Sequence, residues 1–230
     1  MTAPGPRPIG RDEARDVPTR WRIASHTVLG EGAVSDYVDD VVITPGGDEM
    51  HRQYLLHPGA VAVIAIDEQD RVVVVRQYRH PVGYQLIEPP AGLLDADGES
   101  WLGAAQRELA EEAMLAADDW RLLIDMFTSP GCNSECIRFF LARGLRPAPR
   151  PDGFVVEHEE AEMEVCLVPL ADLLDGIYAG DVQSPTVVAG ALALEAARLA
   201  RRLDSLRPAD SPWPARDVRR GNLEAIAGLG

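Results

Sequence analysis

Three glutamates in a stretch of helical periodicity carry the strongest chemical signal in the sequence. Glu108, Glu111 and Glu112 are spaced i, i+3 and i+4, so a helix places them on one face. Like charges at this spacing repel by about 0.2–0.5 kcal/mol per pair unless a cation lies between them. Mg²⁺ prefers oxygen ligands and is commonly held between carboxylates and substrate phosphates. The cluster therefore predicts a magnesium site, at which Mn²⁺ could substitute.

The surroundings of the three glutamates distinguish this prediction from a simpler alternative, the solvated acidic face of an amphipathic helix. An extended IEPPAG segment is followed by a glycine-containing loop that leads directly into the helix. A loop carbonyl, such as that of Ala91, can then add a ligand to the helix carboxylates. Arg107 stands four residues before Glu111 and is expected to hold it by a salt bridge.

The segment from Gly92 to Leu115 resembles the Nudix box, G-x5-E-x7-R-E-U-x-E-E-x-G-U, in which U is a bulky apolar residue. The matching residues are Gly92, Glu99, Arg107, Glu108, Leu109, Glu111, Glu112 and Leu115. Two departures are visible: six residues rather than five separate Gly92 from Glu99, and Met114 replaces the last glycine. At Met114 the chain would have to leave the helix without the freedom of glycine at positive φ.

The segments flanking the box resemble the ADP-ribose pyrophosphatase branch of the family, including its actinobacterial members. Gln77-Tyr78-Arg79 and Glu88-Pro89-Pro90-Ala91-Gly92 match its QYR and E-x-PAG segments. Pro130 lies sixteen residues after Met114, and Ser129-Pro130-Gly131 with Glu135 matches its SPG-x-x-x-E pattern. The resemblance covers about residues 20 to 204. It implies Mg²⁺-dependent hydrolysis of ADP-ribose to AMP and ribose 5-phosphate.

The resemblance also implies a metal-ligand set. Glu108 and Glu112 would be the main ligands, and the carbonyl of Ala91 would complete a site. Glu111 would bridge the metals or support the other ligands, and it is counted with both the metal-binding and the catalytic residues.

The catalytic base is expected in the acidic segment His158-Glu159-Glu160-Ala161-Glu162, which matches the loop that carries the base in this branch. Deprotonating water requires a carboxylate within hydrogen-bond reach. Alignment favours Glu160, with Glu159 as second choice. A segment this acidic could also be merely solvated, so the assignment of each single glutamate stays open.

Three further residues are predicted to contact substrate by the same resemblance. Arg79 would bind a phosphate, with a surface arginine on a strand as the alternative. Glu88 would face the ribose or a partner subunit, and Glu135 belongs to the matched SPG pattern.

The pattern of elements favours a mixed α+β fold, because strands outnumber helices and local hairpins dominate. Strands are expected at about residues 21–28, 34–43, 60–66, 71–78, 120–127, 136–143 and 163–168, and helices at 101–116 and 184–203. The resemblance implies the Nudix α/β/α sandwich around a mixed sheet, with N-terminal strands exchanged between the subunits of a homodimer.

The domain organisation expected from these patterns has four parts. Residues 1–18 form a flexible leader, 19–45 an N-terminal β element for dimerisation, 46–204 the Nudix domain and 205–230 a C-terminal tail.

Composition limits the class of partner. The 230 residues include 37 acidic and 22 basic side chains, a formal net charge of −15. This balance argues against binding a nucleic-acid backbone or an anionic bilayer, both of which require clustered Lys and Arg. The longest apolar runs are far shorter than a membrane span, and no secretory signal is apparent. Three cysteines without metal-site spacing fit a reducing cytoplasm.

Three other functions remain open from the sequence alone. The same chemistry could act on another nucleotide sugar or dinucleotide. The domain could bind ADP-ribose as a regulator without hydrolysing it, although all the box carboxylates are present. A structural acidic scaffold would show no dependence on Mg²⁺.

Overall fold

The computed structural model describes residues 5–96, 98–151 and 163–229. Contacts divide the chain into two compact units. One unit comprises residues 1–27, 39–52 and 213–230, and the other comprises residues 28–38 and 53–212.

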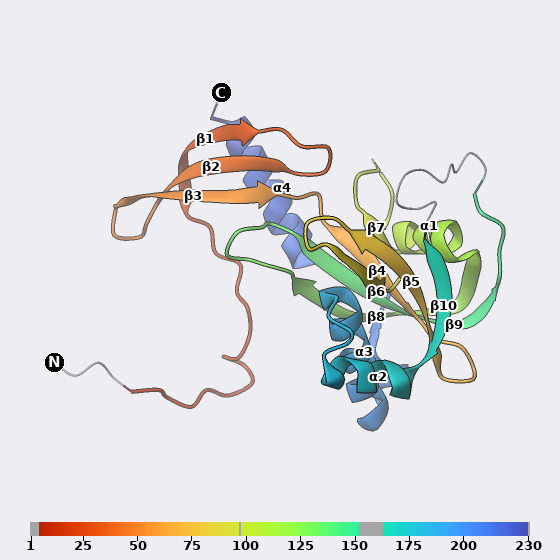
Figure 1. Cartoon of the computed structure of the whole chain (residues 1–230). Helices are drawn as coiled ribbons and strands as arrows, with labels where there is room; N and C mark the ends of the chain where they lie inside the picture. Colours follow the sequence, from red (N-terminus) through yellow and green to blue (C-terminus); the bar gives the residue numbers. More distant parts are fainter. Residues whose placement is uncertain (1–4, 97, 152–162, 230) are drawn as a thin grey trace. The chain divides into compact units, whose positions relative to one another are not determined.

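The elements follow one another as a mixture of strands and helices (Figure 1). The strands are β1 (Arg22–Gly30), β2 (Asp36–Ile43), β3 (Glu49–Leu56), β4 (Ala60–Ala65), β5 (Arg71–Arg79), β6 (Tyr84–Glu88), β7 (Ala91–Leu93), β8 (Leu115–Phe127), β9 (Cys136–Pro147), β10 (Glu164–Pro169) and β11 (Arg207–Pro208). The helices are α1 (Trp101–Ala113), α2 (Leu170–Ala179), α3 (Pro185–Leu199) and α4 (Pro214–Ala227), with a short 3₁₀ turn at Leu203–Ser205. The mixed α+β class expected from the sequence is confirmed.

Two sheets form the centre of the larger unit. The first has the order β11-β8-β9-β4-β7, in which β4 runs parallel to β9 and antiparallel to β7. The second has the order β10-β5-β6 and is antiparallel throughout. The turn at residues 67–70 joins β4 to β5, so one hairpin connects the two sheets.

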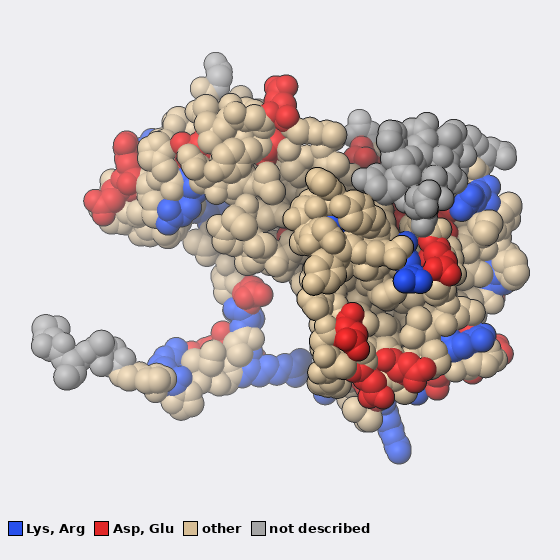
Figure 2. All heavy atoms as spheres, viewed as in Figure 1, with Lys and Arg blue, Asp and Glu red and all other residues tan. Residues whose placement is uncertain are grey.

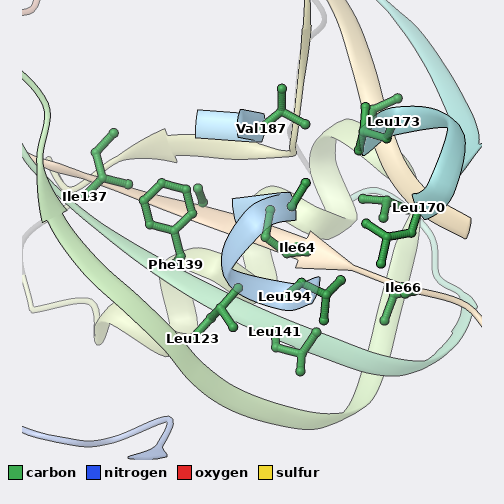
Figure 3. Packing of buried hydrophobic residues seen from close by; sticks show 14 of the residues in the cluster. Ile64, Ile66, Leu123, Ile137, Phe139, Leu141, Leu170, Leu173, Val187 and Leu194 are labelled. Carbon is green, nitrogen blue, oxygen red and sulfur yellow. The ribbon is translucent and has the colours of Figure 1, made fainter. Parts of the chain in front are cut away.

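Strand β4 is buried along its whole length and packs on both faces. Ala62 and Ile64 belong to a core cluster that includes Leu173 of α2 and Leu194 of α3 (Figure 3). The alternate residues of the strand, Val61, Val63 and Ala65, pack with Leu109 of α1 in a second cluster. Because side chains alternate along a strand, the continuous apolar run of β4 requires helices on both sides.

The N-terminal strands form a separate three-stranded sheet, β1-β2-β3. Two of these strands were expected; the polar sequence of β3, EMHRQYLL, gives no clear alternation to predict it. Helix α4 lies in the segment expected to be a tail. In the smaller unit Arg20 Nη2 donates to the carbonyl of Val218 at 3.3 Å, and the guanidinium occupies the space that a Cβ on Gly221 would need.

Helix α1 has defined ends. The Ser100 hydroxyl caps its start by accepting the amide of Gly103 at 3.0 Å. The chain leaves the helix at Met114, which adopts the left-handed conformation at φ 53° and donates its amide to the carbonyl of Ala110 at 3.1 Å. Met114 therefore adopts the conformation for which the Nudix box uses glycine, at a cost of about 1 kcal/mol for a residue with a Cβ.

None of the helices in the described ranges is both long and apolar enough to cross a membrane.

Candidate active site

Arg107 is the centre of the carboxylate cluster on α1. Its Nε and Nη2 donate to the two oxygens of Glu99 at 3.0 and 3.1 Å. Its Nη1 donates to Glu108 Oε1 at 2.6 Å and to Glu111 Oε2 at 2.8 Å. The predicted bridge to Glu111 therefore forms, and the same guanidinium also holds two further carboxylates. The bidentate pair with Glu99 fixes the orientation of the planar group as well as its position.

The charges around Arg107 do not balance. Glu99, Glu108 and Glu111 surround one cation, and they raise the pKa of Arg107 above its ordinary value, first through the hydrogen bond to Glu99. With Glu112 one helical turn after Glu108, the described residues place four carboxylates around Arg107, and the guanidinium of Arg150 donates to the carbonyl of Glu111 at 2.9 Å. The site thus has an excess of negative charge that a divalent cation would neutralise.

Glu108 is buried beside the loop that precedes the helix. Its carboxylate occupies the space into which a Cβ on Gly92 would project, so a side chain at position 92 would displace the carboxylate of Glu108. Burial raises the pKa of Glu108 to about 7; the charges of Glu111 and Glu99 add to the rise, while Arg107 opposes it.

Glu112 is also buried, and it contacts the end of the IEPPAG segment. The amide of Ala91 donates to Glu112 Oε2 at 3.1 Å. Ala91 is held in place because β7 pairs with β4, with Ala91 opposite Ala62, and because the amide of Val63 donates to the carbonyl of Pro90 at 2.8 Å. The backbone of Ala91 thus lies next to a predicted metal ligand.

The residues present fit a divalent cation. Within the described ranges no group of three or more His, Cys, Asp or Glu side chains is arranged to hold a metal ion by itself. Mg²⁺ does not require such a group, because it typically binds to one or two carboxylates together with waters and phosphates. A buried carboxylate with a pKa near 7 among other carboxylates is a group whose ionised form a cation would stabilise.

Arg79 and Glu88 form a second polar group, across the β5–β6 hairpin. Arg79 Nε and Nη2 both donate to Glu88 Oε2, at 3.0 and 2.7 Å. The hydroxyl of Ser184 donates to Glu88 Oε1 at 3.3 Å. Glu88 is buried and Arg79 is half-exposed, so the carboxylate fixes one edge of the guanidinium while the rest faces solvent. Ser184 is the N-cap residue of α3, but its side chain makes no cap hydrogen bond.

Glu135 lies in a third group, directly before β9. Its Oε2 accepts the hydroxyl of Thr128 at 2.7 Å, and its Oε1 lies 3.5 Å from His57 Nε2. His57 Nδ1 accepts the amide of Gly59 at 3.0 Å, so a neutral ring carries its proton on Nε2, facing Glu135. In the part of the chain that the structure describes, no hydrogen bond joins Glu135 to the α1 carboxylates or to Arg79.

The structure therefore brings the predicted site residues together in part. Glu108, Glu111, Glu112 and Ala91 share one group, Arg79 and Glu88 share another, and the segment from Glu88 to Ala91 connects the two. Glu159 and Glu160 lie outside the described residues.

Several contacts of the site were not predicted from the sequence, and three of them differ in how far the sequence could have shown them. The hydrogen bonds of Arg107 to Glu99 and Glu108 could have been anticipated, because the box places Glu99 just before the helix and the other two residues within it. No pattern in the sequence predicts the hydrogen bond between Ser184 and Glu88, because 96 positions separate the two residues.

The negative charge of the chain is not confined to this site. Figure 2 shows acidic side chains gathered over α2, whose sequence includes Asp172 and Asp175. Only part of the net charge of −15 therefore relates to a cation.

Comparison with known proteins identifies the family. The NUDIX domain model matches residues 56–185. The chain is 39% identical to an ADP-ribose pyrophosphatase of Mycobacterium tuberculosis over 191 residues, which are 83% of this chain and 89% of that protein. It is 40% identical to a methanol dehydrogenase activator of Bacillus methanolicus over 123 residues, 54% of this chain and 65% of that protein. The chain belongs to the Nudix hydrolase family, whose members typically use a divalent metal.

A solved structure shows the same fold. It is described as an ADP compounds hydrolase, and it superposes with a TM-score of 0.66 at 21% identity. The match covers 82% of this chain and 100% of that chain. The Nudix-like fold implied by the box is therefore confirmed.

The raised pKa of Glu108 predicts that cation binding depends on pH. Because the protonated form of Glu108 persists up to about pH 7, a cation must displace that proton at lower pH. The apparent affinity for Mn²⁺, measured by electron paramagnetic resonance, is expected to fall about tenfold from pH 8 to pH 6.

The control for this measurement is Glu108→Gln, which cannot ionise. This variant should bind Mn²⁺ more weakly and lose most of the pH dependence in the same interval. An affinity of the unaltered protein that stays constant from pH 8 to pH 6 would contradict the raised pKa.

Proposed function

We propose that this protein hydrolyses the pyrophosphate of ADP-ribose to AMP and ribose 5-phosphate in a reaction that depends on Mg²⁺. The observation that carries the proposal is the carboxylate cluster of α1 and the loop before it, in which Arg107 binds Glu99, Glu108 and Glu111. The identity of 39% over 83% of the chain to a protein named ADP-ribose pyrophosphatase supports the choice of substrate.

The chemistry of the substrate explains why an acidic site suits it. A pyrophosphate resists attack because its negative oxygens repel an incoming nucleophile. When bound, Mg²⁺ supplies positive charge to the phosphate oxygens, lowers the pKa of bound water and stabilises the leaving phosphate. Glu108 and Glu112 would hold it, with the carbonyl of Ala91 as a further ligand. Glu111 would bridge or support these ligands.

Arg79 is suited to bind a phosphate oxygen of the substrate. Glu88 accepts hydrogen bonds from its Nε and Nη2, and within the described residues Nη1 has no hydrogen-bond partner. The pair with Glu88 restricts the guanidinium before substrate arrives, so less side-chain freedom is lost on binding. In this proposal Glu88 positions Arg79 and could also meet the ribose.

Two roles rest on the resemblance to the ADP-ribose pyrophosphatase branch. Glu160, with Glu159 as second choice, would take the proton of the attacking water. Glu135 would contribute to binding the substrate, with His57 and Thr128 fixing its two oxygens.

A nucleotide sugar is the second candidate substrate class. The chain is 31% identical to a GDP-mannose pyrophosphatase of Enterobacter over 132 residues, 54% of this chain. A purely regulatory domain that binds ADP-ribose without hydrolysing it is the third candidate.

The experiment that tests the proposal is a substrate panel. ADP-ribose, ADP-glucose, GDP-mannose and NADH are incubated with the protein and Mg²⁺, and the products are separated by chromatography. We expect AMP and ribose 5-phosphate from ADP-ribose at the highest kcat/KM. A higher kcat/KM for GDP-mannose would contradict the substrate, and ADP-ribose binding without product would favour the regulatory domain.

Two variants make a matched pair for the same assay. Glu112→Gln should lose both Mn²⁺ affinity and at least about 100-fold in turnover, because it removes a ligand. Glu160→Gln should keep Mn²⁺ affinity and lose turnover by about the same factor, because it removes only the base. Near-normal turnover of Glu160→Gln would discard that residue as the base.

We also propose that the protein is a homodimer in which the N-terminal strands take part. Several apolar side chains in and beside β1 and β2 are 43–48% exposed, which a second subunit could cover. They are Trp21, Val28, Leu29, Val34 and Tyr37.

Light scattering coupled to size-exclusion chromatography tests the dimer. The expected mass is twice the 25.0 kDa of the chain. A mass of 25.0 kDa at micromolar concentration would contradict it. Trp21→Ser is the informative variant, because it should shift the protein toward the monomer without touching the α1 carboxylates.

A further inference from the structure

Arg138 is a fully buried arginine that the proposed reaction does not use. It lies in β9, where its neighbours Ile137, Phe139 and Phe140 are also buried. A buried charge is costly unless it is paired and hydrogen-bonded. Its position in an apolar strand therefore calls for a role that an apolar residue could not fill.

The partners of Arg138 come from two distant parts of the chain. On the neighbouring strand, Asp125 accepts from Nε at 2.7 Å and from Nη2 at 3.2 Å. From the C-terminal segment, the carbonyls of Ser211 and Pro212 accept from Nη1 at 2.7 Å and from Nη2 at 3.0 Å. Arg138 thus fastens the segment that follows β11 to the central sheet.

Asp125 and β11 strengthen the same attachment. Arg207 Nη2 donates to Asp125 Oδ2 at 3.0 Å, and Arg207 pairs with Leu122 in the sheet. Arg207 is half-exposed and Arg138 is buried, so the two arginines hold Asp125 from the outside and the inside of the protein.

The guanidinium of Arg138 also contacts the start of helix α1. Its Cζ lies 5.0 Å from the ring centroid of Trp101, the first residue of α1. Trp101 follows Ser100, the cap of the helix, and stands two residues after Glu99. Glu99 in turn accepts both hydrogen bonds from the fork of Arg107.

We infer that Arg138 is a positioning residue for the metal site, which acts through Trp101 and Glu99. The inference rests on the proposed function, because it assumes that the α1 carboxylates bind a cation. Arg138 holds the indole, the indole fixes where the loop joins α1, and the loop presents Glu99 to Arg107.

The electrostatic consequence concerns Arg107. While Glu99 accepts hydrogen bonds from Nε and Nη2 of Arg107, the charge of Glu99 neutralises part of the positive charge that Glu108 and Glu111 would otherwise face. If Glu99 withdraws, that charge is left to Glu108 and Glu111 alone and competes with an incoming cation. Loss of the contact between Arg138 and Trp101 should therefore weaken cation binding without altering any ligand.

The test compares Mn²⁺ affinity, measured by electron paramagnetic resonance, in variants of the full chain. Arg138→Gln should raise the dissociation constant about five- to tenfold, and Arg138→Lys should recover part of the loss because it keeps the charge. Arg207→Gln is the matched control. It removes the other arginine on Asp125 and should change the dissociation constant less than twofold.

A second readout follows the helix start itself. The amide of Gly103, which donates to Ser100, should exchange with solvent faster in Arg138→Gln and unchanged in Arg207→Gln. Unchanged exchange together with unchanged Mn²⁺ affinity would overturn the inference. If the unaltered protein binds no Mn²⁺, the proposed function fails, while the exchange of Gly103 still decides whether Arg138 holds the helix.

Trp101→Leu covers the case in which Arg138→Gln does not fold. It removes the ring but leaves Arg138 paired with Asp125, so no buried charge is left unpaired. We expect the same five- to tenfold loss of Mn²⁺ affinity, and no further loss when Arg138→Lys is added. If the double variant lost Mn²⁺ affinity by the product of the two single losses, the two residues would act independently, which would contradict the inference that Arg138 acts through Trp101.

Discussion

The site depends on the hydrogen bonds that the guanidinium of Arg107 donates to three carboxylates. One guanidinium binds Glu99 before the helix and Glu108 and Glu111 within it. These carboxylates would otherwise repel one another, and their distances are set by one planar, permanently charged group. Glycine at position 92 leaves room for Glu108, and the backbone of Ala91 holds Glu112. The loop, the helix and the adjoining strand β7 thus position the carboxylates of one acidic cluster.

The local part of this arrangement could be predicted from the sequence. The box residues follow one another within one loop and one helix, so spacing alone places Glu108, Glu111 and Glu112 on one face of the helix. The β4 run is apolar at every position and indicates a strand covered on both faces, as observed. Met114 shows the limit of a pattern: the expected glycine is missing, yet the chain turns at the same place and in the left-handed conformation.

The contacts between distant segments could not be predicted. Ser184 meets Glu88 across 96 positions, and Arg138 meets the carbonyls of Ser211 and Pro212 more than 70 positions away. Such pairs are set by how strands and helices pack, for which a single sequence gives no periodicity. The base assignment at Glu159 and Glu160 stays a prediction, since both lie outside the described residues.

The central proposal is that the bidentate geometry of the Arg107 guanidinium, and not its charge alone, arranges the α1 carboxylates as a cation site. Arg107→Lys keeps the charge and loses the bidentate geometry. A titration of this variant with Mn²⁺ at pH 8 therefore separates the effect of the geometry from the effect of the charge. We predict a dissociation constant raised at least about fivefold, with helix content unchanged by circular dichroism. An affinity equal to that of the unaltered protein would contradict the account.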